Sequence, residues 1–220
     1  MRKSQVKRYP YDQKRGLDMD RALLEGAIRH TFAVEAESIA ALSEKLDMDT
    51  ILKIVQTLGD CKGKVLVAGC GTSAAAAKKV AHSLCSVEVP ACYIHPSDAV
   101  HGGLGKLQEE EVLILVSKGG NTQEIVNFIP ACKTKKATLI GVTENCESTL
   151  GRQADIVYNV RVDKEPCPFN MLATASTLAV IAAFDAVCIA LMHYTHYTRE
   201  QFAVIHPGGA VGSRLLNNEK

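Results

Sequence analysis

Two glycine-rich turns carry the residues best suited to bind an anion. The first, Gly69-Cys70-Gly71-Thr72-Ser73, follows a short apolar run and precedes four alanines that favour a helix. The second, Ser117-Lys118-Gly119-Gly120-Asn121-Thr122, takes the same position after another apolar run. Glycines let a backbone turn closely around a ligand, and the first N–H groups of a helix attract negative charge. Two such turns, each with hydroxyl groups, predict a phosphate site.

Either turn by itself has a structural explanation, because a glycine after a strand also lets the next helix pack closely. Neither turn matches G-x-x-x-x-G-K-[ST], and the first lacks the third glycine of the dinucleotide fingerprint. The pair of turns therefore favours a phosphate monoester over a nucleotide, and we expect no cofactor.

Three side chains are candidates for proton transfer: Glu165, His101 and His206. Glu165 precedes Pro-Cys-Pro, a rigid segment that would hold its carboxylate in one orientation. His101 opens His-Gly-Gly-Leu-Gly, and His206 opens His-Pro-Gly-Gly-Ala-Val-Gly. Each residue also has a simpler alternative, namely a solvated loop carboxylate or a structural histidine. Their positions in glycine-rich loops keep the functional interpretation open.

The elements that must position these residues follow from the hydrophobic pattern. Short apolar runs alternate with helical stretches, which predicts βαβ units and a doubly wound α/β fold with a parallel sheet. The expected strands cover residues 64–68, 91–94, 112–116, 137–142 and 155–160. The expected helices cover residues 20–46, 73–86, 122–135, 148–154 and 173–193, with others beginning near 49 and 198. Ligands bind beyond the carboxyl ends of such strands, where both turns are expected.

Composition excludes several classes of function. The 220 residues carry 25 basic and 24 acidic side chains, a net charge of +1, so no general attraction to nucleic acid or anionic membranes is expected. The longest apolar segment, 178–192, contains Asp185 and is shorter than a membrane span, which predicts a soluble cytoplasmic protein. Residues 1–18 are expected to form a flexible basic arm and 19–220 a single domain. The eight cysteines form no metal-binding pattern and are expected to be reduced core thiols.

The motifs together resemble the sugar isomerase (SIS) domain family. GCGTS and SKGGNT are similar to the phosphate turns of these domains, and HPSDAVHGGLG, KEPCP and HPGGAVG resemble arabinose-5-phosphate isomerases in particular. The likeness runs from about Gly26 to Leu216 and corresponds to the short form without CBS modules. It implies a flavodoxin-like, five-stranded parallel sheet with helices on both faces, and a homotetramer. It also implies cofactor-free interconversion of D-arabinose 5-phosphate and D-ribulose 5-phosphate through an enediol, in lipopolysaccharide or capsule synthesis.

The resemblance assigns roles to the candidate residues. Glu165 would move the proton between C1 and C2, because an enediol intermediate needs a positioned carboxylate and donors facing the oxyanion. His101 would contact the sugar hydroxyls, and His206 would reach into a neighbouring subunit's site. The phosphate would be bound by the two turns, through Gly71, Thr72, Ser73, Ser117, Lys118, Gly119, Asn121 and Thr122.

Three positions depart from the isomerase pattern. The family's lysine in the first turn is Thr72 here, a residue found in hexose-phosphate SIS domains. In the second turn the family has S-x-S-G-E-S, whereas this chain has Gly119 for a serine and Asn121 for the glutamate. Two alternatives therefore stay open: an isomerase of a hexose or heptose phosphate, and a regulator that binds a phosphosugar without turnover. We expect Lys118 to restore the missing positive charge from the opposite turn.

Overall fold

The structure is a computed structural model that describes residues 20–208. The predicted flexible arm, residues 1–18, lies outside the described residues. The predicted extent of a single domain, 19–220, reaches beyond them at both ends and stays a prediction.

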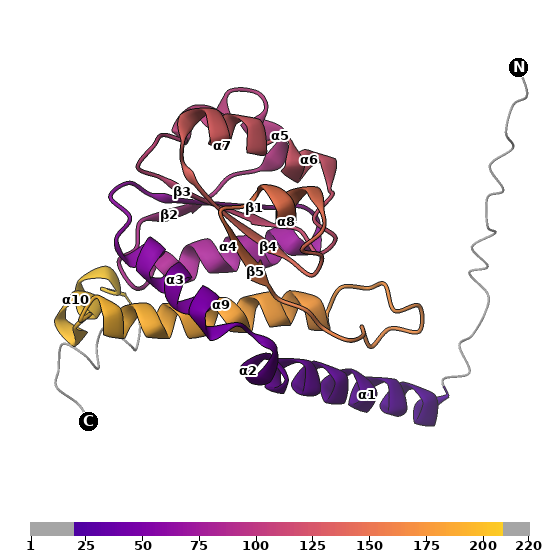
Figure 1. Cartoon of the computed structure of the whole chain (residues 1–220). Coiled ribbons are helices and arrows are strands. Elements are labelled where there is room, and N and C mark those ends of the chain that lie inside the picture. The colour runs from indigo at the N-terminus through magenta and orange to yellow at the C-terminus, as the bar shows by residue number, and fades with distance from the viewer. Residues whose placement is uncertain (1–19, 209–220) are drawn as a thin grey trace, which may run out of the picture.

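The strands form one parallel sheet in the order β2-β1-β3-β4-β5, as Figure 1 shows. This is the flavodoxin-like order, so the predicted fold class is confirmed. The order reverses between β1 and β3, which makes the carboxyl ends of these two strands the topological switch point where ligands bind. The strands are β1 (Val65–Gly69), β2 (Ala91–Tyr93), β3 (Val112–Val116), β4 (Thr138–Thr143) and β5 (Ile156–Asn159).

Helices cover both faces of the sheet, which explains why β1 and β3 are buried throughout. On one face lie α3 (Met48–Gly59), α4 (Thr72–Cys85) and α9 (Ala175–Tyr194). On the other lie α5 (Pro96–Ala99), the 3-10 turn η1 (Gly103–Lys106), α6 (Gln123–Val126), α7 (Ile129–Lys135) and α8 (Thr149–Gln153). Alternate residues of each strand enter alternate cores: Val65 and Val67 face α4 and α9, while Leu66 and Ala68 face the short helices.

Two predicted helices are interrupted. The single helix expected over residues 122–135 is wrong, because the chain forms α6 and then α7 with Pro130 in its first turn. Proline lacks an N–H, so it begins a helix more readily than it continues one. The helix expected over 20–46 is divided at Ala41 into α1 (Arg21–Ala40) and α2 (Leu42–Lys45).

Helix α9 is a long apolar element that packs on one face of the sheet. It has 20 residues, and by length and composition it could cross a membrane, contrary to our expectation that no segment was long enough. Half of its most apolar window is buried inside the molecule. Phe184 packs edge-on against Tyr158 of β5, with ring centroids 5.5 Å apart, and Asp185 pairs with Lys79 of α4. This is the packing of a core helix.

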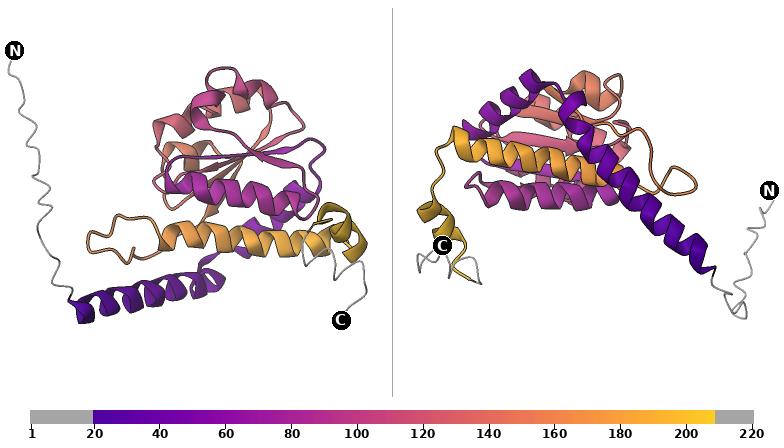
Figure 2. Two further views of the ribbon diagram at one scale, coloured as in Figure 1. Left: turned by 180° about the vertical axis from the view of Figure 1, so that it is seen from behind. Right: turned by 90° about the horizontal axis from the view of Figure 1, so that it is seen from below.

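The first and last described helices lie away from the sheet. Helix α1 projects beyond the sheet and its helices, and Figure 2 shows this from two further sides. Within α1 only Val34 is buried, while Leu23 and Phe32 are 68% and 70% exposed. Helix α10 (Arg199–Ile205) lies beyond the carboxyl end of α9.

The cysteines only partly match the prediction of core thiols. Cys132 and Cys188 are buried, and the other six are at least partly exposed. Three of these six, Cys61, Cys70 and Cys92, pack against the core, and all eight thiols are free, so the prediction of reduced thiols agrees with the structure while the core location holds only in part.

Candidate functional site

The two glycine-rich turns leave the sheet side by side. Gly69 of β1 is in register with Val116 of β3, so the chain turns into Gly71 and into Lys118 at the same edge. Between the turns lies a pocket of about 120 Å³. Its polar lining comes from the first turn (Thr72, Ser73), the second turn (Lys118), the end of β4 (Thr143, Glu144) and the start of α9 (Ser176, Thr177).

The first turn presents the amino end of α4 to this pocket. Gly71 is the N-cap residue and has φ +57°, a left-handed conformation that glycine adopts without strain. Because glycine has no side chain to cap the helix, the first N–H groups of α4 stay available to solvent or to a ligand. The hydroxyls of Thr72 and Ser73 line the pocket at this positive helix end, an arrangement that suits an anion.

The second turn is held by its own hydrogen bonds. Ser117 Oγ lies 3.0 Å from Thr122 Oγ1 and accepts a hydrogen bond from the Gly120 N–H at 3.2 Å. Asn121 turns away to support the neighbouring segment, since its Oδ1 accepts from the Thr149 N–H at 2.9 Å. Lys118 is the predicted residue of this turn that lines the pocket, and the other four, Ser117, Gly119, Asn121 and Thr122, are not part of its lining.

Glu165 lies behind the lining of this pocket, with its side chain wholly buried, and it contacts the lining residues Lys118 and Ser176. Its Oε1 accepts hydrogen bonds from Lys118 Nζ at 2.7 Å and from Ser176 Oγ. Its Oε2 accepts from the backbone N–H groups of Thr174 at 3.0 Å and Ser176 at 3.4 Å. The carboxylate thus caps the amino end of α9, where the helix dipole stabilises negative charge.

These contacts decide the charge of Glu165. Burial by itself raises its pKa, but the hydrogen bonds from Lys118, Ser176 and Thr174, with the positive charge of Lys118, lower the pKa to about 2. Lys118 also lies 3.8 Å from Glu144, whose pKa is raised by burial even though Lys118 opposes the shift. One lysine is therefore placed between two carboxylates, and Glu165, which it contacts more closely, is the one held ionised.

The loop between β5 and α9 orients Glu165. The Glu165 N–H donates to Asn170 Oδ1 at 2.6 Å, with Asn170 in a left-handed conformation at φ +54°. Cys167 Sγ accepts from the N–H groups of Met171 at 3.2 Å and Leu172 at 3.1 Å, contacts that lower the pKa of its thiol. We predicted that the rigid Pro-Cys-Pro segment holds the Glu165 carboxylate in one orientation. The hydrogen bonds across the loop are a further restraint on Glu165.

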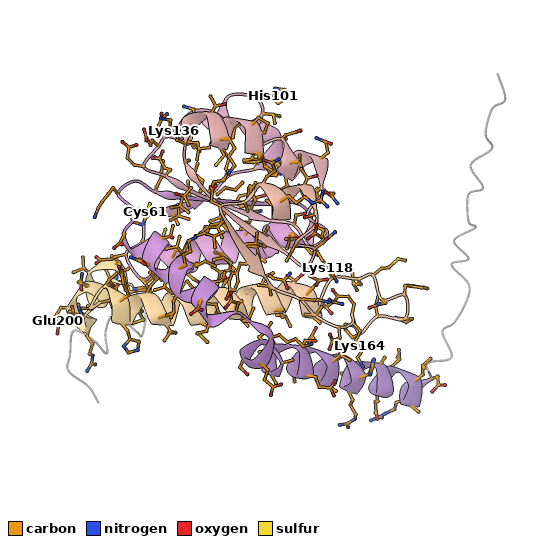
Figure 3. All side chains as sticks on the ribbon, in the orientation of Figure 1. Cys61, His101, Lys118, Lys136, Lys164 and Glu200 are labelled. Atoms are coloured by element: carbon orange, nitrogen blue, oxygen red, sulfur yellow. The ribbon has the colours of Figure 1, made fainter. Side chains whose placement is uncertain are left out.

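The two candidate histidines lie away from this pocket. Figure 3 places His101 on the side of the short helices, on the far side of the sheet from α9 and well removed from Lys118. His206 follows α10, and Gln201 of α10 donates to Glu88, just after the carboxyl end of α4, at 2.8 Å. The pocket lies at the amino end of α4, so His206 of the same chain is at the opposite end of that helix. Its ring stacks on Phe202, with centroids 3.9 Å apart.

Sequence reasoning missed four polar residues of the site: Thr143, Glu144, Ser176 and Thr177. Glu144 directly follows β4, so the rule that ligands bind at the carboxyl edge of a parallel sheet could have identified it. Ser176 and Thr177 belong to the first turn of α9, where no motif distinguishes them from other helix starts.

A larger pocket, of about 270 Å³, opens on the other side of the first turn. Its titratable lining residues are Cys70, Tyr93, His95 and Glu124. His95 Nδ1 accepts from the Ser97 N–H at 3.3 Å and so caps α5, which is a structural role. The smaller pocket is the better candidate for chemistry because its lining residues Lys118 and Ser176 both contact the buried carboxylate of Glu165.

Comparison with known proteins adds to this geometry. A family model described as the SIS domain matches residues 58–190. Arabinose 5-phosphate isomerase KpsF of Escherichia coli O6:H1 (strain CFT073) is 35% identical over 207 residues, which are 94% of this chain and 62% of that protein. The chain thus spans less than two thirds of the length of this curated relative.

Two solved structures are similar to this fold. A candidate sugar-phosphate isomerase from Listeria monocytogenes is 57% identical, with a TM-score of 0.85 over 86% of this chain and 100% of that one. An Escherichia coli CFT073 protein in complex with arabinose 5-phosphate is 29% identical, with a TM-score of 0.81 over the same shares. The sheet order, the two turns and the match of the family model over more than half of the chain agree: the chain belongs to the SIS domain family.

Proposed function

We propose that this chain is a cofactor-free aldose–ketose isomerase of a sugar phosphate. The observation that carries the proposal is the buried, ionised carboxylate of Glu165, which contacts Lys118 and Ser176 in the lining of the pocket between the two glycine-rich turns. A phosphate monoester would be bound at the amino end of α4 and beside Lys118, which leaves the carbonyl end of the sugar to face Glu165. We infer that Ser73 takes part in binding the phosphate, and that Ser117 and Thr122, which we predicted to bind it too, support the turn that carries Lys118.

The reaction requires the net transfer of one proton between neighbouring carbons. Glu165 would take the C2 proton of the aldose, while the electrons of that C–H bond form the C1–C2 double bond of an enediol. A hydroxyl proton moves from O2 to O1, and the carboxyl returns a proton to C1 to give the ketose. The hydroxyl of Ser176, which contacts Glu165, and that of Thr177, which belongs to a residue of the same pocket lining, would stabilise the developing oxyanion.

The names of the relatives suggest the sugar. KpsF and other relatives at 34–37% identity are named arabinose 5-phosphate isomerases, and one solved structure holds arabinose 5-phosphate. We therefore propose D-arabinose 5-phosphate and D-ribulose 5-phosphate as the substrate pair, in the synthesis of lipopolysaccharide or capsule sugars.

The test is solvent exchange at the substrate. With D-arabinose 5-phosphate in heavy water, proton NMR should show loss of the C2 proton and appearance of ribulose 5-phosphate. Glu165→Gln should slow the exchange by about 10²–10⁴-fold, the usual contribution of a positioned base. Glu147→Gln is the matched control, because its carboxylate is 80% exposed and pairs with Arg152 on the surface. A wild-type rate no faster than that of Glu165→Gln would overturn the proposal.

A second candidate function is binding without turnover. It is favoured by Thr72, which lacks the family's positive charge, and by Asn121, whose side chain supports the backbone at Thr149. Calorimetry with arabinose 5-phosphate and with hexose 6-phosphates separates the possibilities. Saturable binding without deuterium exchange supports a regulator, and exchange confined to a hexose phosphate changes the substrate.

We also propose that the protein acts in the cytoplasm as a homotetramer, with His101 and His206 completing the site. The distance of His206 from Glu165 within one chain supports a contribution across a subunit interface.

A further inference from the structure

In the free protein the carboxylate of Glu165 has no oxygen free to accept a proton. Lys118 and Ser176 donate to Oε1, and the backbone N–H groups of Thr174 and Ser176 donate to Oε2. A carboxylate offers about four lone-pair positions, and all of them are engaged here. A general base must accept a proton in the plane of its carboxylate, so one donor has to leave before Glu165 can act.

Only one of these donors is built to move. Two are backbone N–H groups at the start of α9, and Ser176 is a buried hydroxyl, 8% exposed, in the same helical turn. Lys118 has a backbone fixed by hydrogen bonds from the Thr143 hydroxyl and the Glu144 N–H, each 3.0 Å from its carbonyl. Its side chain, in contrast, is 42% exposed and has four rotatable bonds. The lysine head group can therefore move while the turn stays in place.

We propose that Lys118 locks Glu165 in the free protein and releases it when the phosphate group of the substrate binds in the pocket. This inference rests on the proposed isomerase function and adds to it a positioning residue that acts through the base. Release couples the activity of the base to occupation of the site.

The surroundings of Lys118 supply the driving force. Lys118 is the cation among the pocket-lining residues that the structure describes, because the first turn carries Thr72 where the family has a lysine. A phosphate dianion carries more charge than one carboxylate and attracts the ammonium group more strongly. Glu144, 3.8 Å from Nζ, offers a second anionic contact as the head group moves. Lys118 thus has an anionic partner at every stage.

The groups that face this pair come from each surrounding element. Glu144 follows the end of β4. Arg161 follows β5, and its positive charge favours the ionised form of Glu144, that is, it lowers the pKa of this carboxyl. The first turn of α9 contributes the neutral groups of Thr174 and Ser176. Asp163 is engaged elsewhere, in an ion pair with Lys45 at 2.8 Å. The change in charge around Glu165 on binding is therefore dominated by Lys118.

The pH profile of the isomerase tests the proposal. The acid limb of kcat/KM reports the free enzyme, and the acid limb of kcat reports the complex with substrate. In the wild type, the limb of kcat should lie at higher pH than that of kcat/KM by about 1–3 units, the effect of losing an opposite charge nearby. In Lys118→Met the lock is absent, so the kcat/KM limb should rise by a similar amount and the two limbs should converge.

Two further variants distinguish the release of Glu165 by Lys118 from the general effect of removing a lysine. Lys118→Arg keeps a flexible cation and should restore the separation of the limbs. Lys133→Met is the matched control: Lys133 is 40% exposed and pairs with Asp155 at 2.5 Å, on the opposite face of the sheet. It should leave both limbs unchanged. The ionisation of the substrate phosphate affects the pH profiles of all variants equally. The proposal is therefore judged by the differences between the variants' acid limbs. Coincident limbs in the wild type would overturn the proposal.

A second measurement distinguishes failure of the lock from failure of the proposed function. Carbon-13 NMR of the protein labelled at glutamate carboxyls identifies Glu165 by the signal missing in Glu165→Gln. Inorganic phosphate should shift this signal in the wild type, and Lys118→Met should show the shifted position without phosphate. If phosphate moves the Ser73 amide signal and leaves the Glu165 signal in place, the ligand binds without release and the lock is excluded. This readout needs no turnover.

Discussion

Glu165 shows how a buried charge is stabilised in this fold. A carboxylate removed from water is costly unless it is paired and hydrogen-bonded, and here Lys118 supplies the charge while Thr174 and Ser176 supply hydrogen bonds. The result is a group that stays ionised at any physiological pH. Such a carboxylate is in the correct state to accept a proton, but it is a weak base for as long as all of its donors stay in place.

The same residue makes the stability of the protein depend on pH. The folded-state pKa of Glu165, about 2, lies below its ordinary value of 4.5, so its charge stabilises the fold above that ordinary value. This contribution should be lost as the pH falls from about 5 toward 2. Urea unfolding of wild type and Glu165→Gln should therefore show a stability difference at pH 7 that shrinks with acid. Glu147→Gln, altered at an exposed carboxylate, should show no such trend.

At the scale of elements, the turn after β3 is shaped by one glycine. Gly120 has φ +69°, and a Cβ at this position would overlap Ser148 Oγ and Thr143 Oγ1. Its carbonyl accepts from the Leu150 N–H at 3.0 Å, which ties the turn to the start of α8. The turn cannot relax without moving Ser148, the N-cap residue of α8.

Substituting each of the two adjacent glycines by alanine distinguishes strain at Gly120 from a general effect of changing the turn. Gly120→Ala should destabilise the protein by about 2 kcal/mol or more, because left-handed strain and overpacking each cost about 1–3 kcal/mol. Gly119→Ala should be nearly neutral for stability, since a Cβ there meets no atom within 4 Å. Chemical denaturation of the two variants measures the difference. Equal stability of both would contradict this account of the turn.

For the whole molecule, the distance between Glu165 and His206 is decisive. The pocket lies at the amino ends of α4 and α9, whereas α10, whose C-cap residue is His206, lies beyond their carboxyl ends. Helix α9 alone has 20 residues, which span about 30 Å. If His206 acts in catalysis, it acts in a second copy's site. The exposed Leu23, Ile28 and Phe32 of the projecting α1 provide apolar surface that a second copy could bury.

Subunit complementation tests this arrangement. Glu165→Gln and His206→Ala should each be inactive alone, because each disables every site of a homo-oligomer. After mixing, unfolding and refolding together, some sites should combine an intact Glu165 from one chain with an intact His206 from another. Recovery of activity is the expected result in the exchange assay. Mixtures that stay inactive, although they form hybrid oligomers, would place His206 outside the active site.

Much of this architecture was predictable from local patterns. The five strands were recognisable as short apolar runs, because a strand covered on both faces needs apolar residues throughout. The two glycine-rich turns followed from their places after β1 and β3, and the sheet rule put both at one edge. Pro130 marked a break that the helical pattern across residues 122–135 concealed.

What the sequence determined by itself was the order of the elements and the candidates Lys118 and Glu165, since these follow from residue type and spacing along the chain. Only the tertiary structure decided that Lys118 contacts Glu165, that Ser176 and Glu144 join them, and that His101 and His206 lie elsewhere in the same chain. The physical reason is that these contacts join residues far apart in the chain: Lys118 follows β3, Glu144 follows β4, and Ser176 lies in α9. The distances between these residues depend on how the helices pack on the sheet. The spacing of residues along the chain does not specify that packing.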